Sequence, residues 1–276
     1  MLIWLVLIPL IAAALIGLCK APARPTALLS ASLTLALGIW ALVSFDGCSS
    51  CWSRFEGMDL QLTLAPALSK VMLLLTILVT FATVLGTTPP QGGEASWYNS
   101  ALLISAGATG AFLSDNIISF FAFHELALIP TFVMIGLYGR GDRRTTAWRA
   151  TLYLGLASMV LLAALLMIGT QAGFTFSGLK DFMASGRELA HAELIGALLI
   201  AGFGTLISLF PFHSWAAPAY ASAPAPVAMM HAGVLKKFGL YGLFMFQPLM
   251  ETGFLPWTNI LLVLLVCNVI WVGYVT

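Results

Sequence analysis

The sequence has 276 residues, of which 60% are hydrophobic and 8% are charged, whereas soluble domains carry about 25% charged residues. This composition excludes a soluble globular protein, so lipid must be the solvent. Twelve Lys and Arg nearly balance eleven Asp and Glu, giving a net charge of +1, which leaves no basic surplus to bind nucleic acid.

Apolar stretches long enough to cross a bilayer follow one another along the chain. A span needs about 20 apolar residues to cross a hydrocarbon core about 30 Å thick. In chain order, the sequence predicts spans over 2–18, 25–45, 71–93, 95–114, 116–138, 150–171 and 194–210, a proline-rich break over 211–226, then spans over 227–250 and from 254 onward. Runs this long without alternating polarity exclude a β-barrel. We therefore expect an all-α polytopic membrane protein with about nine transmembrane helices.

The first apolar stretch is expected to remain as a helix. It has neither a basic region at its start nor a small-residue cleavage site before Lys20, and a secretory signal peptide needs both.

Lys and Arg in the connections predict the orientation in the membrane. With nine spans, the odd-numbered connections hold Lys20, Arg24, Arg140, Arg143, Arg144 and Arg149, and the even-numbered ones hold Arg54, Lys180 and Arg187. The more basic side faces the cytoplasm. We therefore expect a multi-pass protein of the cell inner (plasma) membrane with its N-terminus outside.

Two cysteines, Cys48 and Cys51, then fall in an external loop. Such a C-x-x-C pair is compatible with a disulfide or a metal site. Two unpaired or casually oxidised thiols are the simpler interpretation, because no second pair of ligands follows at zinc spacing. We expect no metal site.

Charged residues inside predicted spans are the first candidates for function. A charge near the bilayer centre costs at least about 2.5 to 3.5 kcal/mol, so it marks a protein interior or a water-filled path. Glu125 lies about nine residues into the fifth span, and Lys236 and Lys237 lie about ten residues into the eighth. Adjacent helical positions point about 100° apart, so the two lysines cannot share one face. A glutamic acid that only hydrogen-bonds to a neighbouring helix is an alternative of nearly equal weight for Glu125.

Histidines could relay protons near neutral pH. His213 lies in the broken stretch after the seventh span, where irregular backbone is tolerated only inside protein or along a cavity. For His124, His213 or His231 taken singly, a packing role is the simpler interpretation. The sequence has no cysteine spacing for an iron–sulfur cluster and no dinucleotide-binding glycine motif, so we expect no cofactor and no redox centre in this chain.

Four segments together resemble the antiporter-like proton-translocating subunits of respiratory complex I, and most closely the chain 4 (NuoM) type. They are FAFHELALIP (121–130), LFPFHSW (209–215), APAP (223–226) and HAGVLKKFGLYG (231–242). The same superfamily includes Mrp cation/proton antiporter subunits and the membrane arms of energy-converting hydrogenases. The resemblance is dense from about residue 99 to residue 246.

The resemblance implies roles for four residues. Glu125 matches the glutamate that modulates a lysine and couples to the neighbouring subunit, and Lys237 matches the lysine that relays protons toward the membrane centre. Lys236 stands where relatives commonly carry an apolar residue, and His213 matches the histidine after the broken seventh helix. The implied site residues are therefore Glu125, Lys237, Lys236 and His213.

The chain departs from the family in two respects. The family's seventh-helix lysine, which starts the proton path, falls at Leu206. Lys236, Lys237 or water held near Thr205 and Ser208 could take over its role. In addition, the family has fourteen helices with two inverted five-helix repeats. The expected organisation here is an N-terminal three-helix segment (1–92), the first repeat with its broken seventh helix (93–250) and the start of a missing second repeat (251–276), so the chain is expected to be a fragment, a split subunit or a remnant.

The function implied by the resemblance is proton translocation in the membrane arm of an NADH:quinone oxidoreductase, driven by electron transfer elsewhere in the complex. The expected partners are other membrane-arm subunits and the lipid bilayer, and protons are the transported species. Two alternatives remain: a subunit of an Mrp-type Na⁺/H⁺ antiporter or membrane hydrogenase, and a non-conducting membrane scaffold, which Leu206 and the missing repeat favour.

Overall fold

The computed structural model describes residues 1–44, 49–55, 58–64, 66–250 and 257–275, and most of them are helical. In chain order the elements are α1 (Leu2–Gly17), α2 (Ala23–Ser44), β1 (Ser49–Phe55), β2 (Met58–Thr63), α3 (Ala67–Gly86), α4 (Glu94–Leu113), α5 (Ile117–Tyr138), α6 (Arg143–Ala172), α7 (Phe176–Ala184), α8 (Ala192–Leu206), α9 (Ala216–Ser222), α10 (Ala225–Met230), the π-helical turn η1 (His231–Leu235), α11 (Lys236–Met245), α12 (Gln247–Met250) and α13 (Trp257–Val275).

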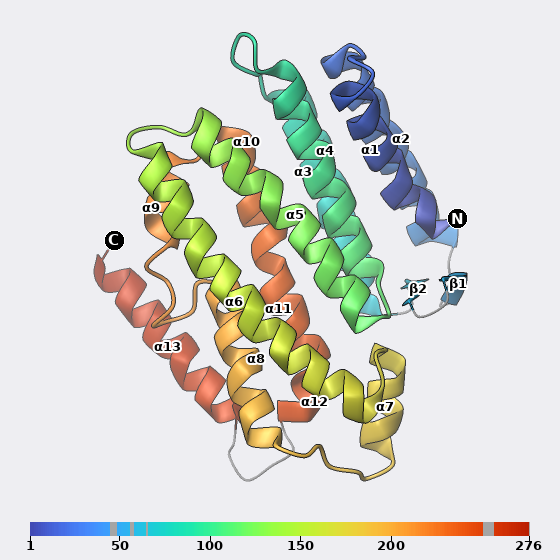
Figure 1. Ribbon diagram of the computed structural model, residues 1–276, viewed down its shortest axis with the longest axis vertical. Coiled ribbons are helices and arrows are strands. Elements are labelled where there is room, and N and C mark those ends of the chain that lie inside the picture. The colour runs from blue at the N-terminus through green and yellow to red at the C-terminus, as the bar shows by residue number, and fades with distance from the viewer. Residues whose placement is uncertain (45–48, 56–57, 65, 251–256, 276) are drawn as a thin grey trace.

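The long helices pack side by side in a bundle whose connections gather at two ends (Figure 1). The β1–β2 hairpin, α7 and α12 lie toward one end, and the α3–α4 connection, the α5–α6 connection and α10 lie toward the other. At the centre lies α4, most of whose side chains are buried against its neighbours. In lipid, only helices satisfy every backbone N–H within their own segment. The helical bundle confirms the predicted all-α polytopic architecture.

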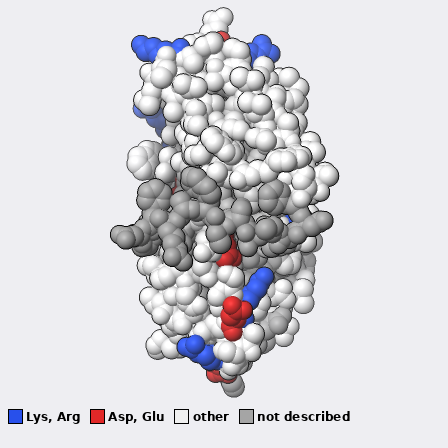
Figure 2. Space-filling model, turned by 90° about the vertical axis from the view of Figure 1, so that its right-hand side faces the viewer, with Lys and Arg blue, Asp and Glu red and all other residues white. Residues whose placement is uncertain are grey.

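Five helices in the described part of the chain are long and apolar enough to cross a membrane, namely α2, α3, α5, α6 and α13. The apolar helices α1 and α8 are shorter. Figure 2 shows uncharged side chains over most of the upper half of one face, below Lys and Arg at its top end. The count of nine spans stays a prediction.

Several predicted boundaries differ from the structure. The sixth span was expected to begin at residue 150, but α6 begins at Arg143. The third span was expected to continue to residue 93, but α3 ends at Gly86. Pro89 and Pro90 explain the difference, because proline offers no N–H to a helix and biases the preceding residue away from helical geometry. The eighth span was expected as one helix over 227–250. The structure has a continuous helical run from Ala225 to Met245, in which the π-helical turn η1 lies between α10 and α11, and the short helix α12 follows it.

The sequence did not indicate the β1–β2 hairpin or the short helix α7. The two strands pair antiparallel within the predicted external loop. Cys48 lies outside the described residues and the side chain of Cys51 is not described, so the interpretation of the two thiols as unpaired or casually oxidised stays a prediction. In α7, Phe176, Leu179 and Phe182 are buried at helical spacing, which lays an amphipathic helix along the end of the bundle.

Small residues allow α4 and α5 to approach closely. A methyl group at Gly107 would lie 2.6 Å from the carbonyl oxygen of Phe123 and 2.7 Å from the amide nitrogen of Ala127. These neighbours belong to the α5 backbone, so they cannot rotate aside. Close backbone approach of this kind is a main source of helix association in lipid.

We therefore expect Gly107→Ala to lower the thermal unfolding temperature of the protein in detergent. Overpacking costs about 1 to 3 kcal/mol, which outweighs the gain of up to about 1 kcal/mol from replacing glycine in a helix. Gly155→Ala is the matched control, because no atom lies within 4 Å of a methyl group at Gly155 in α6. Equal unfolding temperatures for the two variants would contradict the close contact between α4 and α5.

Candidate functional site

Glu125 lies in the middle of α5, at a depth set by the start of that helix. The side chain of Asn116 accepts hydrogen bonds from the backbone N–H groups of Ile118 and Ser119 and so begins the helix at Ile117. Glu125 is eight residues further along, about 12 Å at 1.5 Å per residue. Its side chain is 30% exposed, so the carboxylate lies at the edge of the packed interior.

Two groups bind the same carboxylate oxygen. Ser158 in α6 donates its hydroxyl to Oε1 of Glu125 at 2.5 Å. Nδ1 of His124 lies 3.3 Å from that oxygen. The sequence did not single out Ser158, because one serine in an apolar helix is ordinary and its partner is 33 residues away. The carboxylate of Glu125 thus has two polar partners, Ser158 and His124, inside a membrane-spanning bundle.

His124 connects α5 with the helix that carries the two lysines. Its ring is fully buried and packs edge-on against Phe238, with 5.1 Å between ring centroids. Phe238 directly follows Lys237 in α11. Nε2 of His124 is buried and makes no hydrogen bond to the described residues. The buried imidazole therefore lies between the glutamate on α5 and the start of α11.

Lys236 is held by aromatic rings. Its Nζ lies 4.9 Å from the ring centroid of Tyr220 in α9 and 5.9 Å from that of Trp215. A desolvated ammonium gains about 2 kcal/mol from such rings. Lys237 is half-buried and makes no ion pair or hydrogen bond with the described residues. The two lysines are therefore in different surroundings.

The same tyrosine also contacts His231. Nδ1 of His231 lies 3.3 Å from Oη of Tyr220, and Nε2 of His231 is buried with no partner among the described residues. His231 opens the π-helical turn η1 immediately before Lys236, and π-turns are frequent at functional sites. Tyr220, His231 and Lys236 thus form a second polar cluster, which we call the Tyr220 cluster.

The break after α8 shapes the Tyr220 cluster. The helix ends at Leu206, and Ser208 adopts a positive φ of 60°. The indole N–H of Trp215 then donates to the carbonyl oxygen of Thr205 at 3.0 Å, which satisfies one acceptor freed at the helix end. The predicted break in this helix is confirmed, and it brings Trp215 over Lys236.

Leu206 itself faces the lysine-bearing helix. It is buried, and a methyl group at Gly239 would lie 3.2 Å from the Cβ of Leu206. Gly239 is three residues after Lys236, so both project from one face of α11. Leu206, where the sequence predicts that a lysine is missing, therefore faces the side of α11 that carries Lys236.

The structure does not join all the predicted site residues. His213 stacks on Phe210 and contacts Trp271 of α13, with centroid separations of 5.6 and 6.1 Å. None of the hydrogen bonds or ring contacts of the described residues links it to Glu125 or to the lysines. Likewise, within the described ranges no ion pair joins Glu125 to Lys236 or Lys237. The carboxylate and the ammonium groups belong to two clusters that share α11 as a neighbour.

Comparison with known proteins gives consistent matches. Residues 114–275 match the family described as NADH:quinone oxidoreductase/Mrp antiporter, TM. The NAD(P)H-quinone oxidoreductase chain 4 2 of Microcystis aeruginosa is 32% identical over 211 residues, which are 74% of this chain and 37% of that protein. The NAD(P)H-quinone oxidoreductase chain 4 1 of Picosynechococcus is 30% identical over 227 residues, which are 80% of this chain and 41% of that protein.

Solved structures share the fold. A chain of respiratory complex I from Thermus thermophilus superposes with a TM-score of 0.77 at 26% identity, covering 90% of this chain and 53% of that one. A chain of the Mrp complex from Dietzia superposes with a TM-score of 0.79 at 22% identity, covering 94% of this chain and 29% of that one. This chain thus spans about two fifths of the two curated relatives.

Proposed function

This chain belongs to the NADH:quinone oxidoreductase/Mrp antiporter transmembrane family, and from that membership we propose that it is a proton-translocating membrane subunit of a complex I-like assembly. The observation that carries the proposal is Glu125, a carboxylate in the middle of a membrane-spanning helix that binds Ser158 and His124. A carboxylate at such depth is costly and marks a functional path. The names of the sequence relatives favour a complex I-like assembly over an Mrp antiporter.

In this proposal, Glu125 sets the electrostatic potential of the interior and Lys237 carries a proton in the membrane plane. His124 lies against both the carboxylate and the start of α11. Coupling between Glu125 and the lysines therefore acts across His124 and α11 rather than through a direct ion pair. Electron transfer takes place in other subunits, and the assembly as a whole is the oxidoreductase. His213 has an accessory place after the broken helix.

Lys236 takes over the role of the lysine that Leu206 replaces. Two observations support this assignment: Lys236 projects from the face of α11 that packs on Leu206, and its ammonium group lies over Tyr220 and Trp215. The aromatic faces stabilise an ammonium group without a neighbouring carboxylate. A lysine held in this way can gain or lose its proton as hydration changes.

The proposal also includes an orientation and a division of the chain. The N-terminus faces outside. This orientation is supported by the basic connections at the opposite end of the bundle, because the side richer in Lys and Arg faces the cytoplasm. Residues 1–92 form the N-terminal segment, 93–250 the first antiporter-like repeat, and 251–276 the beginning of a second repeat. A non-conducting scaffold is the alternative that Leu206 favours.

Purification through a tag on this chain, followed by reconstitution of the assembly in liposomes, tests the proposal. We expect NADH or reduced ferredoxin to drive quinone reduction together with proton movement, which a pH-sensitive dye reports and a protonophore collapses. Proton movement driven by a Na⁺ gradient without any redox substrate would instead indicate an Mrp-type antiporter. Redox activity with no proton movement would indicate a scaffold.

A further inference from the structure

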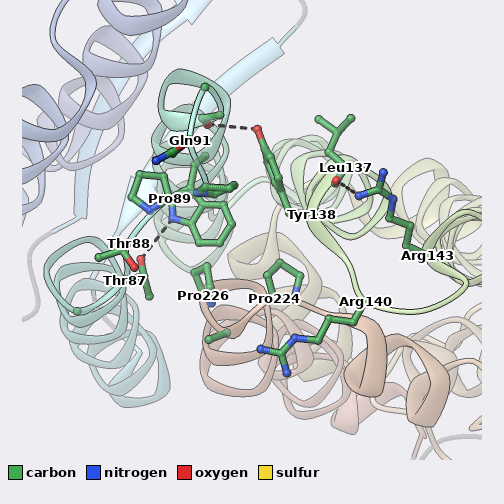
Figure 3. A pocket seen from close by; sticks show the side chains of 16 residues that line it. Thr87, Thr88, Pro89, Gln91, Leu137, Tyr138, Arg140, Arg143, Pro224 and Pro226 are labelled. Atoms are coloured by element: carbon green, nitrogen blue, oxygen red, sulfur yellow. Dashed lines mark hydrogen bonds between the residues drawn. The ribbon is translucent and has the colours of Figure 1, made fainter.

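A pocket of about 830 Å³ lies among three connections of the chain (Figure 3). These connections are at the end of the bundle opposite the β1–β2 hairpin (Figure 1). Three connections form its walls: the α3–α4 connection from Thr87 to Gly93, the α5–α6 connection and the α9–α10 junction at Pro224. The neighbouring helices are apolar, so a polar pocket at their ends lies where a membrane has its headgroups. None of the residues proposed for proton transfer lines it.

Hydrogen bonds between the connections hold the walls in place. Tyr138 donates its hydroxyl to the carbonyl oxygen of Gly93 at 3.2 Å, and Trp97 donates its indole N–H to Thr87 at 3.4 Å. Ser222 donates its hydroxyl to the carbonyl oxygen of Arg140. Figure 3 shows Tyr138 in the middle of these walls. These bonds join the connections to one another around the pocket.

The charge of the pocket is positive. Arg140 and Arg143 line it, and none of its lining residues is acidic. One amino group of Arg143 donates to the carbonyl oxygen of Leu137 at 2.6 Å, which leaves its other N–H groups available. The guanidinium of Arg140 has no hydrogen bond or ion pair to any described residue. The nearby Asp142 is engaged as the N-cap of α6, where it accepts from the backbone of Thr145.

We propose that this pocket binds the phosphate of an anionic phospholipid headgroup. Guanidinium groups match phosphate geometry with paired N–H donors, and basic pockets between helix ends on the cytoplasmic side are suited to such lipids. Leu137, which lines the pocket and is 50% exposed, offers an apolar surface for the acyl chains. A soluble anion would make no use of that surface, so the structure favours a lipid.

Thermal unfolding of the purified protein in neutral detergent, with added lipid, tests this proposal. We expect phosphatidylglycerol to raise the unfolding temperature at concentrations where phosphatidylcholine and inorganic phosphate do not. Arg140→Gln should weaken the apparent affinity for phosphatidylglycerol about tenfold, the effect of losing a hydrogen bond from a charged group to the phosphate. Arg140 is the better position to change, because Arg143 also caps the end of α5.

Arg149→Gln is the matched control, because Arg149 is an exposed arginine of α6 that does not line the pocket. It should bind phosphatidylglycerol with the affinity of the parent. Native mass spectrometry should show retained phosphatidylglycerol in the parent and in Arg149→Gln, and less in Arg140→Gln. Equal stabilisation by both lipids, stabilisation by inorganic phosphate alone, or equal affinities of the two variants would each overturn the proposal.

Discussion

Glu125→Gln is expected to reduce redox-driven proton translocation by about a hundredfold, within the range for loss of a group that transfers or controls a proton. Glutamine has nearly the same shape, and its carbonyl oxygen can still accept the hydroxyl hydrogen of Ser158. It can neither ionise nor take up a proton. Transport should therefore fall while the thermal unfolding temperature stays close to that of the parent. Dye-reported proton uptake by the reconstituted assembly measures the first quantity.

Glu94→Gln is the control for this change. Glu94 occupies the first turn of α4 at the end of the bundle, where a carboxylate is solvated and its loss should leave transport unchanged. If Glu125→Gln transports protons at the parental rate, Glu125 has no role in transport, and the proposed proton-translocating function loses its main support. The scaffold alternative would then stand. Loss of folding in Glu125→Gln, by contrast, would appear as a lower unfolding temperature and a smaller yield of assembly.

Helix positions could be predicted from the sequence because lipid imposes a simple rule. Stretches without charge must be helical when no water is available to the backbone, and α1, α2, α5 and α8 follow that rule closely. The end of α3 was misplaced because Pro89 and Pro90 lie within an uncharged stretch that hydropathy alone does not divide. The hairpin at 49–63 lies in a polar connection, where strand and loop sequences differ little.

Candidate charges were also visible in the sequence, but their partners were not. Glu125 and Lys236 stand out because charges are rare in apolar segments. The contact of Lys236 with Tyr220 depends on the break after α8, which folds α9 back toward α11, and no local pattern encodes that geometry. Ser158 and His124 resemble ordinary packing residues until the helices are assembled. The sequence predicts that Leu206 replaces a lysine, but only the assembled helices show that Leu206 faces α11.

Lys236→Leu is expected to reduce proton translocation by about a hundredfold, and the double variant Lys236→Leu/Leu206→Lys is expected to recover much of it. The physical reason is that residue 206 and residue 236 lie on facing surfaces of α8 and α11, so a lysine at either position can place its ammonium group in the same space.

Lys180→Leu is the control, since Lys180 lies exposed on α7. Lys237→Leu should also impair transport, but Leu206→Lys should not rescue it. Transport that survives in Lys236→Ala/Lys237→Ala would refute the role of both lysines, and a double variant as inactive as Lys236→Leu would refute the exchange between α8 and α11.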